Sequence, residues 1–250
     1  HAADAGIGFL STPFDLPSAR VLIDLGVDGL KLSSGELTNL GFLRDIAAFG
    51  VPMLVSTGMG TADEVLQAAD ACAAAPFLAF FHCVSAYPAP EDECNLLAMP
   101  ALRAATGVPV GWSDHTTGVD SAIVAASVGA RLFEKHLTLD VAMEGPDHAA
   151  SLDPDQMRDY VRRVRAVPAL LGDGVKRRMP SEEENAPLVR RSWHTTRDLA
   201  AGTVLHAEDL IALRPEGGVS PTIDIVGRVL TRDLPASVAI EEGALSESAG

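Results

Sequence analysis

Two histidines have the spacing needed to bind one divalent metal ion. His115 lies in the segment 112–116, which reads Trp-Ser-Asp-His-Thr, and His136 ends the triplet Glu-Lys-His twenty-one residues later. Each follows an apolar run typical of a buried strand, and the ends of neighbouring parallel strands lie side by side. Two imidazoles can hold a divalent ion and leave coordination positions open for substrate oxygens. The alternative is that each histidine only caps its strand by hydrogen bonding.

A second candidate cluster surrounds Lys31. Lys31 and Ser33 share one face of an extended strand, and Glu36 follows Gly35, where the backbone can turn inward. A lysine at the end of a barrel strand can form a Schiff base or contact an anion. The alternative is a surface ion pair.

Hydroxyl side chains follow several of the apolar runs. They are Thr12, Ser34, Ser56 and Ser113. Together with the backbone amides near Gly35 and Gly58 they could bind a phosphate, which matters because the chain contains only three lysines. A single serine in such a place would be a cap, whereas a set of four indicates an anion site.

The elements that would position these side chains are short apolar runs at a steady interval. The runs are Ile7 to Leu10, Gly29 to Leu32, Met53 to Val55, Leu78 to Phe81, Val108 to Trp112 and Arg131 to Leu137. Their starts, at residues 7, 29, 53, 78, 108 and 131, lie 22 to 30 residues apart, which is the spacing of βα units. Runs without polar alternation indicate a parallel sheet. Because polar residues follow all of them, we predict an α/β fold in which the strands surround one site, a (β/α)8 barrel.

The runs account for fewer strands than a barrel requires. We therefore expect this chain to lack about the first two βα units of the barrel, which would precede His1. Helical periodicity is found between the runs, as over Thr61 to Ala74, Ser121 to Val128 and Asp155 to Leu171. The predicted organisation is a partial barrel over 1–172, a linker over 173–189 and a small, mostly β domain over 190–250.

The composition limits the class of protein. Lys and Arg number 19 against 34 Asp and Glu, a net charge of −15, which disfavours nucleic-acid and anionic-membrane partners. No apolar run approaches the roughly 18 residues that span a bilayer. Three scattered cysteines favour a reducing cytoplasm over a disulfide framework. Cys83 is interpreted as a packing residue, because its neighbour His82 points to the opposite face of the strand.

The order of motifs resembles the sialic acid synthase family, which includes N-acetylneuraminate, legionaminate and pseudaminate synthases and spore-coat polysaccharide relatives. The matching segments are Phe9–Asp15, Lys31–Glu36, Ser56–Met59, His82–Pro88, Gly111–Thr116, Glu134–His136, Gly145–His148 and Leu213–Pro215. The part from Arg190 to Leu234 resembles the antifreeze-like SAF domain of that family.

The resemblance implies a transferase that condenses phosphoenolpyruvate with an open-chain N-acyl amino sugar aldehyde. N-acetylmannosamine or a related 6-deoxy diamino hexose would be the acceptor, and a nonulosonic acid and phosphate would be the products. A divalent cofactor, Mn²⁺ or Mg²⁺, held by His115 and His136, would polarise the aldehyde. The functional unit would be a domain-swapped homodimer.

The same resemblance assigns roles to single residues. Glu36 is the favoured base for the water that attacks C2 of phosphoenolpyruvate. Contacts with phosphoenolpyruvate would come from Thr12, Lys31, Ser34, Ser56 and Ser113. Contacts with the sugar would come from Ser85, Tyr87 and Asp147, and Arg214 of the partner subunit would hold the N-acyl group.

Two departures from the family pattern concern the identity of the sugar and the activity of this chain. Ser85 stands where some members carry an amide, so the sugar subtype is undecided. The contacts of the family's first strands have no counterpart after His1, so a molecule that begins there would have little activity. The alternatives are a Schiff-base lyase using Lys31 or Lys135, and an inactive carbohydrate-binding fragment.

Overall fold

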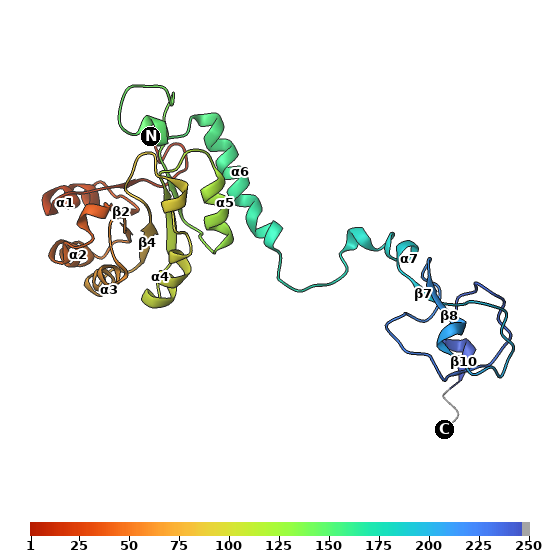
Figure 1. The fold of residues 1–250 in the computed structure, drawn as a ribbon. Coiled ribbons are helices and arrows are strands. Elements are labelled where there is room, and N and C mark those ends of the chain that lie inside the picture. The colour runs from red at the N-terminus through yellow and green to blue at the C-terminus, as the bar shows by residue number, and fades with distance from the viewer. Residues whose placement is uncertain (247–250) are drawn as a thin grey trace. The chain divides into compact units, whose positions relative to one another are not determined.

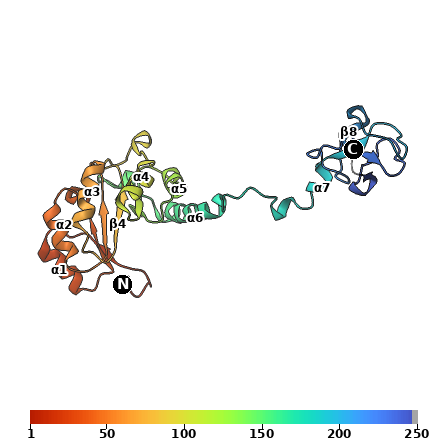
Figure 2. The same ribbon diagram turned by 90° about the horizontal axis from the view of Figure 1, so that it is seen from below.

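The computed structural model describes residues 1–246 as two compact units. The first unit extends from His1 to Gly174 and the second begins at Val175. Each unit has its own hydrophobic core. Figure 1 shows the first unit as a curled sheet with helices along its outer side, and Figure 2 shows it after a quarter turn.

The sheet of the first unit contains six parallel strands in sequence order. They are β1 (Leu10–Ser11), β2 (Gly29–Leu32), β3 (Met53–Ser56), β4 (Leu78–His82), β5 (Val110–Asp114) and β6 (Phe133–Lys135). Each is joined to the next by a crossover that contains a helix, so all six carboxyl ends lie at one edge. The α/β class and the parallel sheet predicted from the spacing are confirmed.

The helices begin and end at residues suited to those positions. They are α1 (Leu16–Asp24), α2 (Leu40–Ala47), α3 (Ala62–Ala71), α4 (Ala98–Thr106), α5 (Asp120–Ser127) and α6 (Pro154–Leu171). Thr61 and Glu64 form a capping box at α3, and Asp153 and Gln156 form one at α6. Gly107 ends α4 with φ = 73°, a left-handed conformation that glycine adopts without a steric cost.

Successive strand residues divide the sheet into a mainly apolar outer face and an inner face of mixed polar and apolar side chains, where Lys31 lies over the ring of Phe81. Leu30 and Leu32 of β2 and Met53 and Val55 of β3 are fully buried in the core cluster that includes helix residues such as Ile46. The residues between them point the other way, because side chains alternate along a strand. The functional residues of the strands therefore lie on the inner, concave face.

Strand boundaries differ from the sequence prediction by a few residues, most of all at β1. The run from Ile7 to Leu10 was expected to form this strand, but Ile7 and Phe9 are 66% and 52% exposed and pairing with β2 begins at Leu10. Within residues 1–246, β1 pairs only with β2 and β6 only with β5. The two additional βα units of a closed barrel remain a prediction.

The second unit consists of short antiparallel pairs. They are β7 (Ser192–Thr195) with β8 (Leu210–Leu213), and β9 (Val229–Leu230) with β10 (Leu245–Ser246). Leu205, Ile225 and Ile240 are fully buried in its core. Val204 forms an isolated antiparallel bridge to Val229.

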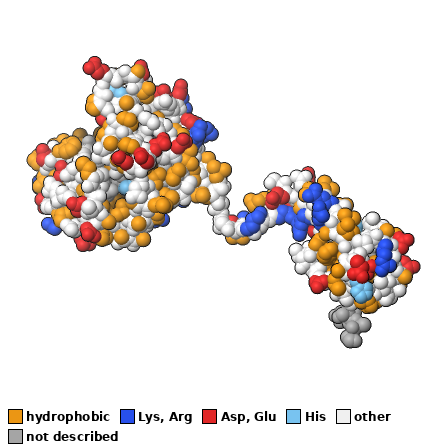
Figure 3. All heavy atoms as spheres, in the orientation of Figure 1, with side chains coloured by type: hydrophobic (Ala, Val, Ile, Leu, Met, Phe, Trp, Pro, Cys, Tyr) orange, Lys and Arg blue, Asp and Glu red, His pale blue; other side chains and the backbone are white. Residues whose placement is uncertain are grey.

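The segment that precedes β7 is rich in basic side chains and includes the short helix α7 (Ala186–Val189). In Figure 3, Lys and Arg gather over this segment, whereas Asp and Glu are spread over the visible face of the first unit. Among the described residues, no helix is both long and apolar enough to cross a membrane.

We expect Ile46→Ala to lower the free energy of unfolding of the first unit by about 2–5 kcal/mol, because it empties a fully buried position. Denaturant unfolding followed by Trp112 fluorescence measures this in a Trp193→Phe background, which leaves one tryptophan. Leu25→Ala is the control, because Leu25 is 72% exposed and its loss changes stability by about 0.5 kcal/mol or less. Equal losses in the two variants would contradict the core described here.

Candidate active site

Four strands contribute side chains to one connected polar cluster on the inner face. The Nζ of Lys31 donates to the Oγ of Ser56 at 2.6 Å and lies 3.5 Å from Oε2 of Glu134. The hydroxyl of Ser113 donates to Oε1 of Glu134 at 2.7 Å. The cluster thus links β2, β3, β5 and β6 across the sheet and places one cation, one carboxylate and two hydroxyls together.

A second group of small polar side chains meets at Gly58. Its backbone N–H donates to the hydroxyl of Ser34 at 3.0 Å, and that hydroxyl lies 3.4 Å from the thiol sulfur of Cys83. A methyl group on Gly58 would collide with Ser85, Ser34 and Cys83. The absence of a side chain at Gly58 therefore allows these three residues to approach one another.

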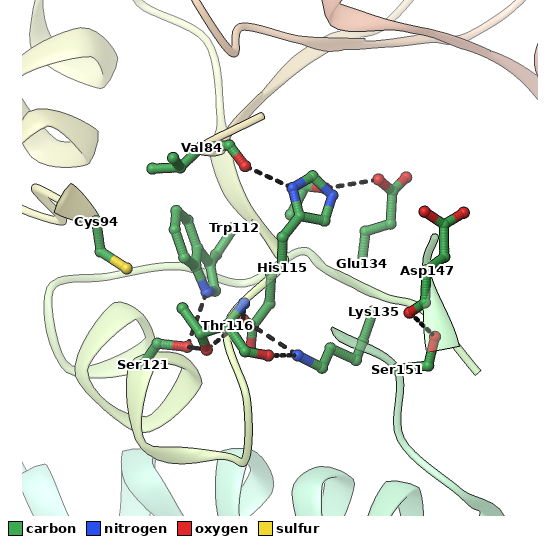
Figure 4. Close-up of polar contacts among 12 residues, drawn as sticks. Val84, Cys94, Trp112, His115, Thr116, Ser121, Glu134, Lys135, Asp147 and Ser151 are labelled. Atoms are coloured by element: carbon green, nitrogen blue, oxygen red, sulfur yellow. Dashed lines mark hydrogen bonds and ion pairs between the residues drawn. The ribbon is translucent and has the colours of Figure 1, made fainter. Parts of the chain in front are cut away.

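The two histidines face each other beside this cluster. Their ring centroids are 5.4 Å apart, with the ring planes at 71°. The Nδ1 of His115 lies 2.7 Å from the carbonyl oxygen of Val84, as Figure 4 shows. A carbonyl can only accept, so Nδ1 carries the proton and Nε2 of the neutral ring keeps its lone pair.

The surroundings of His115 favour the neutral imidazole. The side chain is 5% exposed, and this burial lowers its pKa. The carbonyl of Val84 acts in the opposite direction and His136 lowers the pKa further, so the net shift is downward. At neutral pH the ring is therefore a ligand or an acceptor and carries no charge.

Tyr87 and Asp147 lie on the open side of the histidine pair. The ring centroid of Tyr87 is 4.2 Å from that of His115 and 5.5 Å from that of His136, and the residue is 43% exposed. Asp147 Oδ2 is 3.8 Å from Nδ1 of His136. Burial raises the pKa of Tyr87, and the nearby carboxylates add to this, so its hydroxyl stays protonated and can donate.

The loop that carries Asp147 is held by local hydrogen bonds. Ser151 Oγ donates to the carbonyl of Asp147 at 2.7 Å, as drawn in Figure 4. His148, at the start of a short 3-10 turn, is 2.7 Å through Nδ1 from the hydroxyl of Thr138. His148 thus organises the loop and is not simply directed to solvent.

The structure brings most of the predicted site residues together. They form three groups: Lys31, Ser56 and Ser113 with Glu134; His115, His136, Tyr87 and Asp147; and Ser34 and Ser85 around Gly58. Glu36 instead accepts from Asn39 at 2.9 Å, and Thr12 follows β1 half-buried. Within residues 1–246 neither makes a side-chain hydrogen bond to these groups. Arg214 is exposed in the second unit.

Sequence reasoning missed Glu134, which contacts both Lys31 and Ser113. The sequence could have indicated Glu134, because it lies two residues before His136 and side chains along a strand repeat their direction every second residue. By the same rule Lys135 points to the outer face, where its side chain is 2% exposed and pairs with Asp114 at 3.3 Å. Lys135 is thus withheld from a substrate, which disfavours it as a Schiff-base nucleophile.

Cys83 is a buried neighbour of the serines, as the packing interpretation expects. His82 points away from it, because the His82 Nε2 lies 2.9 Å from the carbonyl oxygen of Cys94 and the ring stacks near Trp112. The two side chains therefore do not form a nucleophile and its base.

The donor set suits a metal ion that keeps open positions. In the described part of the chain, no three His, Cys, Asp or Glu side chains converge as metal ligands. His115 and His136 form a pair, and Nδ1 of His115 donates to Val84. Nε2 of His115 lies 3.4 Å from the hydroxyl of Ser113, whose proton goes to Glu134, so the lone pair of Nε2 can still ligate an ion. Two neighbouring imidazoles can ligate one divalent ion and leave further positions open for oxygen ligands.

Comparison with known proteins decides the family. The NeuB family model matches residues 1–176, and the SAF domain model matches residues 190–240. The chain belongs to the NeuB family. This confirms the resemblance seen in the motifs, and it agrees with the small second unit being a SAF domain.

Similar members of the NeuB family cover nearly all of this chain. The N,N'-diacetyllegionaminic acid synthase of Legionella pneumophila is 40% identical over 96% of this chain and 69% of its own length. That of Campylobacter jejuni is 37% identical over 97% of this chain and 74% of its own. The structure of putative spore coat polysaccharide biosynthesis protein E from Chromobacterium violaceum is 26% identical with a TM-score of 0.78, and covers 98% of this chain and 75% of that one.

We expect Gly58→Ala to lower the free energy of unfolding by about 1–3 kcal/mol, because the new methyl collides with Ser85, Ser34 and Cys83. The matched control is Gly41→Ala in α2, where nothing lies within 4 Å of the added atom. It should leave stability unchanged or raise it by up to about 1 kcal/mol. Urea unfolding measures both, and a stabilising Gly58→Ala would contradict the close approach at this glycine.

Proposed function

We propose that this chain catalyses the condensation of phosphoenolpyruvate with an open-chain N-acyl amino sugar aldehyde, giving a nonulosonic acid and phosphate. The observation that carries the proposal is the pairing of His115 with His136 next to the Lys31 and serine cluster on one face of the sheet. A metal-binding pair for an aldehyde thus adjoins an anion site for phosphoenolpyruvate. Similarity to synthases of legionaminic acid supports the same chemistry.

Phosphoenolpyruvate would bind to the inner-face cluster. Lys31 supplies the positive charge, and the hydroxyls of Ser34, Ser56 and Ser113 supply hydrogen bonds, with Thr12 at the end of β1 as a further contact. Charge-assisted hydrogen bonds of this kind are stronger than neutral ones, and they orient an anion as well as hold it. The bound phosphoenolpyruvate would present its C3 atom towards the histidine pair.

The sugar would bind on the open side of the histidines. His115 and His136 would hold Mn²⁺ or Mg²⁺, which supplies Lewis-acid polarisation of the aldehyde oxygen. Tyr87 and Asp147 border this place, and their hydroxyl and carboxylate suit the hydroxyl groups of an open-chain sugar. Ser85 adds a smaller hydroxyl contact near Gly58.

The second unit would complete the site in a homodimer. Arg214 is exposed after β8 and makes no hydrogen bond or ion pair within residues 1–246, so its guanidinium is available to a partner. We propose that it holds the N-acyl group in the other subunit of a domain-swapped dimer. Three free, buried cysteines suit a reducing cytoplasm as the compartment.

The covalent steps need one base on this chain. A bond would form between C3 of phosphoenolpyruvate and the aldehyde carbon, which turns the aldehyde oxygen into an alkoxide, and water would then add to the cationic C2. A carboxylate would take one proton of that water and pass it to the alkoxide. Phosphate would leave with the electrons of the C2–O bond, and the proton of the new C2 hydroxyl would go to the phosphate as C2 becomes the ketone. Glu36 is the candidate from the family resemblance, and Glu134 is a second candidate because it lies between Lys31 and Ser113.

We expect His115→Ala combined with His136→Ala to lower Mn²⁺-dependent phosphate release by roughly 10²-fold or more, because the polarising ion loses its protein ligands. Phosphate release is measured with N-acetylmannosamine and with its dideoxy-diamino analogues, with and without Mn²⁺. The assay uses this chain and a form extended upstream by about 100 residues. Turnover that survives the double substitution would contradict the metal assignment.

We expect Glu134→Gln to lower kcat by roughly 10²-fold or more, because the amide cannot accept the proton. Glu36→Gln is compared in the same assay. If only Glu36→Gln abolishes turnover, Glu36 is the base and Glu134 positions Lys31. Full turnover in both variants would show that neither carboxylate activates the water.

A further inference from the structure

A buried ion pair lies directly behind the histidine pair. The register of β5 and β6 places Ser113 opposite Glu134 and Asp114 opposite Lys135. The first couple meets on the inner face, and the second meets on the outer face between the sheet and the helices. Asp114 immediately precedes His115, and Lys135 immediately precedes His136.

Asp114 and Lys135 are both withdrawn from solvent. Their side chains are 0% and 2% exposed, and Nζ lies 3.3 Å from Oδ1. Burying two charges is costly, and such a pair often stabilises a protein no better than apolar residues of the same size. Fold stability alone therefore gives a weak reason for this pair, so its contacts are the better guide to its role.

Those contacts converge on Thr116, the residue after His115. Asp114 Oδ1 accepts from the backbone N–H of Thr116 at 2.9 Å and from its hydroxyl at 2.7 Å. The ammonium of Lys135 donates to the carbonyl of Thr116, and Figure 4 shows the Lys135 side chain extended towards it. The residues on both sides of His115 are thus held by one ion pair.

The anchored turn is also tied to the helix layer. The hydroxyl of Thr116 is 2.8 Å from that of Ser121 in α5, and Trp112 Nε1 donates to Ser121 Oγ at 3.3 Å. Trp112 is fully buried in the core. The turn carrying His115 is therefore connected to α5 and to the core, and Lys135, the residue before His136, is bonded to the same turn.

We propose, on the basis of the function above, that Asp114 and Lys135 are positioning residues that fix the imidazole of His115 for metal binding. The pair acts through the backbone on either side of His115 and holds the ring where Nδ1 donates to Val84. Without the ion pair, the His115 ring would turn more freely, and the lone pair of Nε2 would no longer point to the proposed metal position between His115 and His136. A residue that only stabilised the fold would not affect the proton on Nδ1.

The test replaces both charges at once, so that no buried charge is left unpaired. The variant is Asp114→Asn with Lys135→Met, and the control is Arg197→Met with Asp209→Asn, which removes an ion pair with a buried aspartate in the second unit. The readout is the ¹⁵N spectrum of the histidines in the metal-free protein, with His115 assigned from His115→Gln. Mn²⁺ affinity is measured separately by electron paramagnetic resonance.

In the parent and the control, we expect one His115 tautomer with a proton on Nδ1 that exchanges slowly with water. In the Asp114 and Lys135 variant, we expect mixed tautomers and a roughly tenfold faster exchange, together with a 10- to 100-fold weaker Mn²⁺ affinity. A folded variant with the parent's tautomer and the parent's Mn²⁺ affinity would overturn the proposal.

A further variant and the phosphate assay separate the positioning role from fold stability and from the proposed function. Thr116→Val removes the hydroxyl contacts with Asp114 and Ser121 and retains both charges, so it serves if the double variant does not fold, with Ser121→Ala as the control for the second contact. Thr116→Val should speed Nδ1 exchange in the same direction, and an unchanged rate would count against the proposal. If the form extended upstream releases no phosphate while the tautomer still depends on Asp114 and Lys135, the proposed function fails and the positioning role stands.

Discussion

The register between β5 and β6 is the constraint on which the site depends. It pairs Ser113 with Glu134 on one face and Asp114 with Lys135 on the other, and the two histidines follow immediately. A slip of one residue would exchange the faces, placing an ion pair in the concave side and the reactive groups in the helix layer. The apolar outer residues Trp112 and Phe133 hold this register, because the same slip would also remove them from the core.

The proposed anion site around Lys31 consists mainly of neutral hydroxyl and backbone amide groups. Lys31 is its one cationic side chain among the described residues of the cluster, and Glu134 partly neutralises it. Hydroxyls and backbone amides such as that of Gly58 supply the remaining donors. In a chain with a net charge of −15, such donors can bind an anion without additional basic side chains.

The sequence predicted the strands well, because each apolar run ends in polar residues and the spacing is regular. It also indicated the histidine pair, since both residues occupy equivalent strand ends. Glu134 was missed although its alternation with His136 was visible, and the burial of Lys135 was missed because its partner Asp114 is set by long-range register. Ile7 and Phe9 misled the placement of β1, since apolar residues at an edge need not join the ladder.

The contacts of Glu134 describe how the cluster behaves before any ligand arrives. Its carboxylate forms an ion pair with Lys31 and accepts a hydrogen bond from Ser113. It therefore already occupies the donors that an anionic ligand would use. Any anion that binds the ammonium of Lys31 has to compete with this carboxylate, because the two charges already neutralise each other. The ion pair therefore sets a threshold of ligand charge that an incoming anion must exceed.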